Sequence, residues 1–177
     1  MNTDSVFKQA INSDGQGFVA KNMANSDLTV NNSNTLNIDS NSKISAKDVS
    51  ISMDSDNDLS SIVNIDVSHF GGRDPIGTAN LDLNVDNKIN NSGAIIAGKN
   101  VNIDLMDNSY NKLNQNARVI IEAAVATGGA RGALNYTTTN SVDVSQNASI
   151  VAGKDVSVKY MQGETNASGI ESVDCFG

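Results

Sequence analysis

Three pairs of charged or amide side chains recur along the chain: Lys47-Asp48, Lys99-Asn100 and Lys154-Asp155. The interval between one pair and the next is nearly constant. In a repetitive fold these pairs form a spaced row on one edge, and such a row suits contact with sulfated or carboxylated glycans. A second interpretation is that charged turn residues block sheet-edge pairing and keep the protein soluble.

The segment from Asp54 to Asp58 has an acid at every second position, as in a calcium-binding loop whose oxygen ligands converge on one ion. That pattern then requires a glycine where Leu59 stands and a glutamate where Ile65 stands. We interpret the segment as a solvated, turn-rich loop. Calcium binding is left open for Asp54, Asp56 and Asp58.

Other candidates for chemistry are isolated. Asp82 and Asp86 share the outward side of one expected strand and lie about 13 Å apart when extended, too far for the carboxylate pair of a retaining glycosidase. His69 is the single histidine, and the single cysteine, Cys175, has no activating neighbour in sequence. We therefore predict that the chain is not an enzyme and has no catalytic, cofactor-binding or metal-binding residues.

The elements that position the lysine pairs are strands. Each pair lies in a short turn that opens onto a strict alternation of apolar and polar residues, which is typical of a β-strand with one buried and one wet face. The three copies predict three inward sites with matching side chains: Val49, Val101 and Val156; Ile51, Ile103 and Val158; Met53, Leu105 and Tyr160.

The small residue before the lysine is a feature of the turn backbone. Ala46 stands in the first copy where Gly98 and Gly153 stand in the later two. Because alanine at positive φ costs roughly 1 kcal/mol or more, this position does not require a left-handed conformation. Close packing of the turn against the next coil is the better reason for a small residue.

Repetition at this period is typical of a solenoid, in which each unit buries its apolar face against its neighbours. A second marker, Gly71-Gly72-Arg73, recurs about one repeat later as Gly128-Gly129-Ala130-Arg131. We predict an all-β parallel β-helix with about three coils of 18 to 20 residues per 52–57-residue repeat. The expected repeats are residues 12–69, 70–126 and 127–177 of one solenoid segment.

Ala117 to Ala126 contains several helix formers. The β-branched run Val119-Ile120-Ile121 and the following Gly128-Gly129 nevertheless favour a buried strand that ends at a glycine turn.

The composition fits a narrow aliphatic interior within a polar shell. The 177 residues include 26 Asn and 21 Ser but no Trp and only 4% aromatics. A net charge of −8 with scattered lysines and arginines disfavours nucleic acid as a partner. No stretch approaches the roughly 18 apolar residues of a membrane span, and Met1 to Ser5 lack the basic and apolar regions of a signal peptide.

The turns at residues 97–103 and 152–158, with the run from Ala126 to Leu134, resemble the repeat regions of filamentous haemagglutinin-like and leukotoxin-like exoproteins of bacteria. The similarity covers roughly Leu28 to Tyr160. It implies a right-handed parallel β-helix within a very long adhesin that is secreted or displayed on the cell surface and serves adhesion and virulence. Without a signal peptide or a secretion domain, the chain is expected to be a fragment of a longer protein.

The resulting prediction is a structural or adhesive segment that acts through an extended repetitive surface. Its expected partners are a glycan or protein receptor of a host cell or matrix, and flanking repeats of the parent chain. Two alternatives stay open. One is a β-helix carbohydrate-active enzyme with acids converging beside a groove. The other is a phage-type fibre or spike, whose trimerisation would require an exposed apolar stripe.

Overall fold

All the secondary structure in the described part of the chain is β-strand. The computed structural model describes residues 2–17, 22–69, 74–106, 110–123, 127–161 and 164–176. The strands are β1 (Asn2–Gly17), β2 (Met23–Ile38), β3 (Lys43–Ala46), β4 (Val49–His69), β5 (Ile76–Asn91), β6 (Ala94–Ala97), β7 (Val101–Met106), β8 (Tyr110–Ala123), β9 (Gly129–Val144), β10 (Ser149–Ala152), β11 (Val156–Met161) and β12 (Glu164–Phe176). The predicted all-β class is confirmed.

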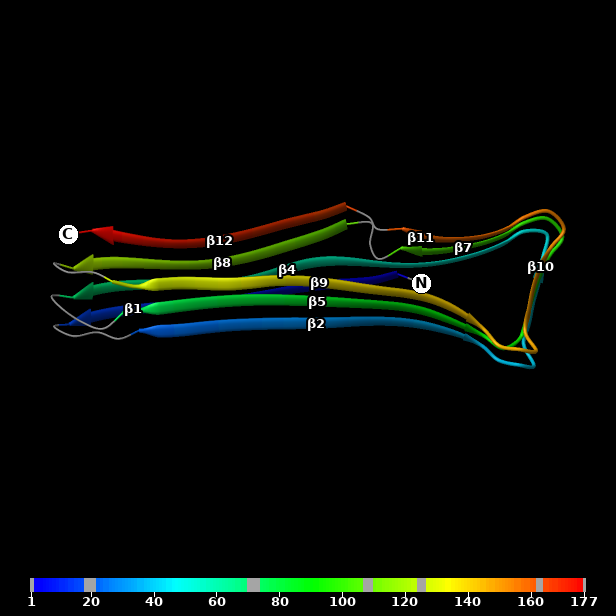
Figure 1. Ribbon diagram of the computed structural model, residues 1–177, viewed down its shortest axis with the longest axis horizontal. Helices are drawn as coiled ribbons and strands as arrows, with labels where there is room; N and C mark the ends of the chain where they lie inside the picture. Colours follow the sequence, from blue (N-terminus) through cyan, green and yellow to red (C-terminus); the bar gives the residue numbers. More distant parts are fainter. Residues whose placement is uncertain are drawn as a thin grey trace.

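The strands form three sheets, and all the pairs between them are parallel. One long sheet has the order β2-β5-β9, and a short sheet has the order β10-β6-β3. The third has the order β11-β7-β4-β8-β12, with β1 also paired to β4. Figure 1 shows the long strands running lengthwise and the short sheet, marked by β10, closing one end.

Each strand pairs with the strand one repeat later. In the β2-β5-β9 sheet, for example, Leu28 pairs with Leu81, and Leu81 pairs with Leu134. One repeat therefore makes one complete pass: out along one long sheet, across the closed end and back along the other. The second glycine marker begins β9, whereas Gly71, Gly72 and Arg73 lie outside the described residues.

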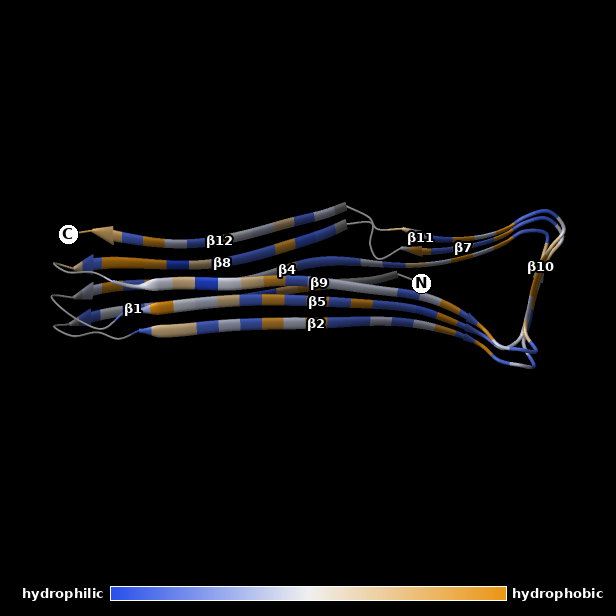
Figure 2. Ribbon diagram, in the orientation of Figure 1, coloured by the Kyte–Doolittle hydropathy of each residue, from blue (hydrophilic) through white to orange (hydrophobic). Residues whose placement is uncertain are grey.

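This register corrects the predicted division of each repeat into three coils of 18 to 20 residues. The strands are much longer than expected, and β4 alone has 21 residues. The alternation of buried and exposed side chains continues through asparagines and serines, which are residue types that usually favour turns. Figure 2 shows hydrophilic stretches inside the long strands. Asn32, Asn34 and Ser55, for example, lie inside strands with their side chains buried.

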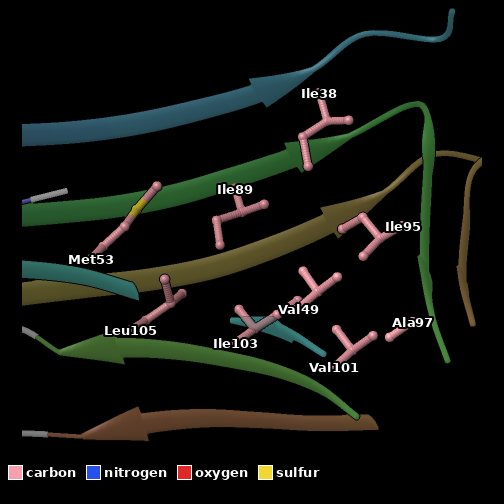
Figure 3. Packing of buried hydrophobic residues seen from close by; sticks show 9 residues of the cluster. All are labelled: Ile38, Val49, Met53, Ile89, Ile95, Ala97, Val101, Ile103 and Leu105. Atoms are coloured by element: carbon pink, nitrogen blue, oxygen red, sulfur yellow. The ribbon is translucent and has the colours of Figure 1, made fainter. Parts of the chain in front are cut away.

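The interior lies between the two long sheets and behind the short one. Nine buried side chains fill the closed end: Ile38, Val49, Met53, Ile89, Ile95, Ala97, Val101, Ile103 and Leu105 (Figure 3). The three predicted rows are confirmed, because their residues pair in register in β4, β7 and β11. Their members in β4 and β7 are buried or half-buried, whereas those in β11 are exposed, so the predicted burial holds for the first two copies only. Two further apolar clusters fill the rest of the interior.

A layer of amide side chains lies between the apolar cluster at the closed end and the next cluster along the strands. The Asn34 Nδ2 donates to Asn87 Oδ1 at 2.9 Å, and Asn87 Nδ2 donates to Asn140 Oδ1 at 3.0 Å. On the opposite sheet, Asn57 Nδ2 donates to Asn111 Oδ1 at 2.9 Å. Buried amides are costly without hydrogen bonds, so ladders that run from repeat to repeat allow asparagine inside this fold.

The strand prediction for Ala117 to Ala126 is confirmed as far as Ala123, where β8 ends. Residues 124–126 lie outside the described part. Val119 and Ile121 of this strand are buried, whereas Ile120 points to the outer face. Within the described ranges, no helix has the length and apolar character needed to cross a membrane.

Candidate functional site

The three lysine turns lie side by side at the corner between the short sheet and the β11-β7-β4 strands. Each follows a short strand and precedes the return strand, because the chain passes this corner once per repeat. The amide nitrogen of Lys99 donates to the carbonyl of Lys47 at 2.7 Å, and that of Lys154 donates to the carbonyl of Lys99 at 2.8 Å. Neighbouring lysine backbones are therefore about one strand spacing, 4.8 Å, apart.

The residues after the lysines are stacked in the same way. Val49 N donates to Asn100 O and Val101 N donates to Asp155 O, both at 2.9 Å. The side chain of Asp48 accepts from Asn100 through both its backbone N and its Nδ2, at 3.2 and 3.1 Å. The structure thus brings together all six residues predicted from the sequence.

The row is a small, mixed-charge surface. The three lysines, Asp48 and Asp155 are exposed, while Asn100 is half-buried. Three ammonium groups stand beside two carboxylates, giving a locally positive strip on a protein of net charge −8. Such a strip suits an anionic, extended ligand held by several weak contacts, because single exposed ion pairs contribute only about 0–1 kcal/mol each.

The outer face of the short sheet extends this surface, which the lysine motif alone did not indicate. Lys43 and Ser45 of β3 are exposed, and Val151 of β10 is 51% exposed. Ile96 of β6 lies between Ser45 and Val151 in register. The alternation of inward Ile44 with outward neighbours is the sequence signal that would have located this face.

The first turn is one residue shorter than the other two, which corrects the predicted equivalence of Ala46 with the turn glycines. Ala46 pairs with Ala97 inside the short sheet, so the glycine position is absent from the first turn. Gly98 N donates to Ala46 O at 2.9 Å, and Gly153 N donates to Ala97 O at 3.0 Å. Neither glycine has a φ in the left-handed region.

The difference in turn length predicts opposite effects for two glycine substitutions. A Cβ on Gly153 would overlap the carbonyl oxygen of Gly98, whereas the nearest atom to a Cβ on Gly98 is 3.7 Å away. We expect Gly153→Ala to lower the free energy of unfolding by about 1–3 kcal/mol through backbone strain. Gly98→Ala should leave it unchanged or raise it by about 0.4–1 kcal/mol, because alanine restricts the unfolded chain.

Urea unfolding of both variants checks this difference. Equal losses for Gly98→Ala and Gly153→Ala would contradict the role of close packing between successive turns.

The acids of the segment that we interpreted as a solvated, turn-rich loop lie in the extended strand β4, so that interpretation is wrong. Asp54, Asp56 and Asp58 alternate with buried Ser55 and Asn57. An extended strand separates alternate residues by about 6.6 Å and holds them in a line rather than around one point. Asp58 binds the Lys8 Nζ at 3.1 Å, and Asp54 Oδ1 accepts from the backbone of Ser55 at 2.9 Å.

The remaining candidates stand apart from the lysine row. Asp82 accepts from Asn135 at 2.6 Å on the outer face of β5, and Asp86 is exposed on the same face, as the parity predicted. His69 ends β4, but its side chain lies outside the described residues; Cys175 is exposed in β12. In the described ranges, no group of three or more His, Cys, Asp and Glu is placed to hold a metal ion.

No protein-family model, curated protein or solved structure matches this chain. Its function is therefore inferred from the geometry of the repeats and of the lysine row.

Proposed function

We propose that this chain is a structural and adhesive segment of a filamentous, surface-displayed or secreted bacterial protein. The observation that carries the proposal is the in-register stacking of equivalent turns, with Lys47, Lys99 and Lys154 joined through their backbones. A stack of this kind presents each surface residue as a row. Affinity then comes from many weak contacts along the row, without a single reactive centre.

We further propose that the stack is a right-handed parallel β-helix continued by flanking repeats of a longer chain. Parallel strands joined by a crossover connection are right-handed in about 98% of cases, which supports this handedness. The parallel register across all three sheets supports propagation, since each repeat offers the next the same set of edges. The proposed place of action is the cell surface or the space outside the cell.

The proposed ligand of the lysine row is a sulfated or carboxylated glycan. Its test is binding of the chain to immobilised heparin, compared with the triple variant Lys47→Gln, Lys99→Gln, Lys154→Gln. If each exposed lysine contributes about 0.5 kcal/mol, the three together contribute about 1.5 kcal/mol. The dissociation constant should therefore rise about tenfold in the variant.

A second triple variant distinguishes binding by the lysine row from a general effect of the protein's positive charges. Lys88→Gln, Lys112→Gln, Lys159→Gln removes the same charge from positions scattered over two sheets. It should weaken binding by no more than about twofold, because screening at 0.15 M salt limits charge effects to about 8 Å. Absence of binding by the unmodified chain, or equal losses in the two triple variants, would contradict the glycan proposal.

A further inference from the structure

The fixed spacing of the lysine row sets a requirement on its ligand. The turns are joined backbone to backbone, by Lys99 N to Lys47 O at 2.7 Å and by Lys154 N to Lys99 O at 2.8 Å. Figure 1 shows them side by side at the closed end. Successive lysines are therefore one strand spacing, about 4.8 Å, apart along the stack. A single sugar of an extended glycan has nearly the same length, so the row offers one ammonium group to each sugar of a chain that runs along the stack.

The ammonium groups of the row gain from an anionic ligand. Within the described ranges, none of the three lysines forms an ion pair. The acid that follows the first lysine, Asp48, instead accepts from the backbone N and the Nδ2 of Asn100, at 3.2 and 3.1 Å. Like charges at the spacing of the row repel one another. A ligand that brings one anion to each lysine therefore removes a repulsion that exists in the unbound protein.

The acids beside the row limit the charge that the ligand can carry. Asp48 and Asp155 are exposed next to the first and the third lysine. A glycan with several sulfates on each sugar would place its surplus anions against these carboxylates, whereas one carboxylate per sugar matches the lysines one to one. A carboxylate on every second sugar only would leave the middle lysine, Lys99, without an anion. The charges of the row therefore favour one anionic group on each sugar.

Two uncharged rows run parallel to the lysines and suit the rest of a sugar. Their members pair in register on the short sheet and on the return strands. Aliphatic side chains contact the C–H face of a sugar ring, and hydroxyl and amide groups hydrogen-bond to its hydroxyls. The outward residues of these rows are Ser45, Ile96 and Val151 on the short sheet, and Ser50, Asn102 and Ser157 on the return strands.

We propose that the ligand of the lysine row is a linear polyuronate, with one carboxylate on every sugar, that lies across the three turns along the stack. The proposal rests on the glycan function proposed above and specifies its ligand. The four-carbon stem of each lysine lets its ammonium group follow a carboxylate on either side of the chain. Three successive sugars therefore bind Lys47, Lys99 and Lys154 in that order or in the reverse order.

The salt dependence of binding measures how many lysines the ligand contacts. The test compares immobilised polygalacturonate, with a carboxylate on every sugar, and immobilised hyaluronate, with one on every second sugar, at equal carboxylate content. For a single charged strand, the logarithm of the dissociation constant rises with the logarithm of the salt concentration by about 0.7 per neutralised charge. We expect a slope of about 2 on polygalacturonate, for three lysines, and about 1.4 or less on hyaluronate.

The middle lysine gives the sharper comparison. Lys99→Gln should lower the slope on polygalacturonate by about 0.7 and raise the dissociation constant about twofold. It should leave binding to hyaluronate unchanged, because carboxylates two sugars apart reach the outer two lysines. The matched variant Lys159→Gln removes an exposed lysine of β11 outside the row and should change neither the slope nor the dissociation constant on either glycan.

Two results would overturn the polyuronate proposal: equal slopes on the two glycans, or equal effects of Lys99→Gln and Lys159→Gln on polygalacturonate. The broader glycan function would survive either result if heparin binding still fell about tenfold in the triple variant of the lysine row. Absence of binding to heparin as well as to polygalacturonate would contradict both proposals. The heparin and polygalacturonate measurements therefore distinguish a wrong ligand class from a wrong function.

Discussion

Replacing Leu81 by alanine is expected to lower the free energy of unfolding by about 2–5 kcal/mol. Leu81 lies on the central strand β5 and is fully buried. Its row neighbours, Leu28 and Leu134, are above and below it in register. Because strands on both sides hold the backbone in place, the site has little freedom to collapse around the lost methyl groups, and a cavity remains.

The same row supplies the matched controls. Leu28 and Leu134 occupy equivalent positions on the edge strands β2 and β9, and both are only half-buried. Leu28→Ala and Leu134→Ala should each cost about 1–2 kcal/mol, since less apolar area returns to water. Urea unfolding of the three variants measures the differences. Equal losses across the row would contradict the central placement of β5.

The sequence predicted the interior rows correctly because its strongest signal was local. In the lysine turns, a polar turn is followed by three alternating apolar residues, and this pattern determines both the strand and its buried face. Repetition then indicated which residues share a row, as Ile51, Ile103 and Val158 do.

The number of coils in each repeat was predicted wrongly, as three instead of one, because asparagine and serine are usually turn residues. Here the amides bond to equivalent amides one repeat away, and their cost of burial is offset by partners that no local pattern reveals. Asn57 and Asn111 illustrate this, since they are one repeat apart in sequence and 2.9 Å apart between Nδ2 and Oδ1.

The candidate site was predicted as a row, and the structure places its six residues together. The shorter first turn was missed, because the lysine motifs themselves align Ala46 with Gly98. Only the strand register, which pairs Ala46 with Ala97, reveals the missing residue. The alignment of the repeats indicates which turns stack on one another. The backbone hydrogen bonds are needed to show which individual residues are in register.

The buried amide ladder leads to the second large effect: Asn87→Ala should lower the free energy of unfolding by about 2–4 kcal/mol. Asn87 is fully buried, accepts from Asn34 at 2.9 Å and donates to Asn140 at 3.0 Å. Each buried polar group that loses its hydrogen bond costs about 1–3 kcal/mol. The half-buried Asn140 recovers part of its loss from water. Urea unfolding measures the change.

Two further variants distinguish the effect of the lost hydrogen bonds on stability from the effects of changed packing and changed strand propensity. Asn87→Leu keeps the number and branching of the side-chain heavy atoms but removes both hydrogen bonds, so it should still destabilise by at least about 1 kcal/mol. Asn84→Ala, at an earlier position on β5, removes an exposed amide whose Nδ2 donates to Asn31 at 2.9 Å, and should change stability by no more than about 0.5 kcal/mol. Equal stability of Asn87→Leu and the unmodified chain would mean that the interior amides contribute only by filling space. Hydrogen bonding between repeats would then not explain why asparagine is tolerated inside these strands.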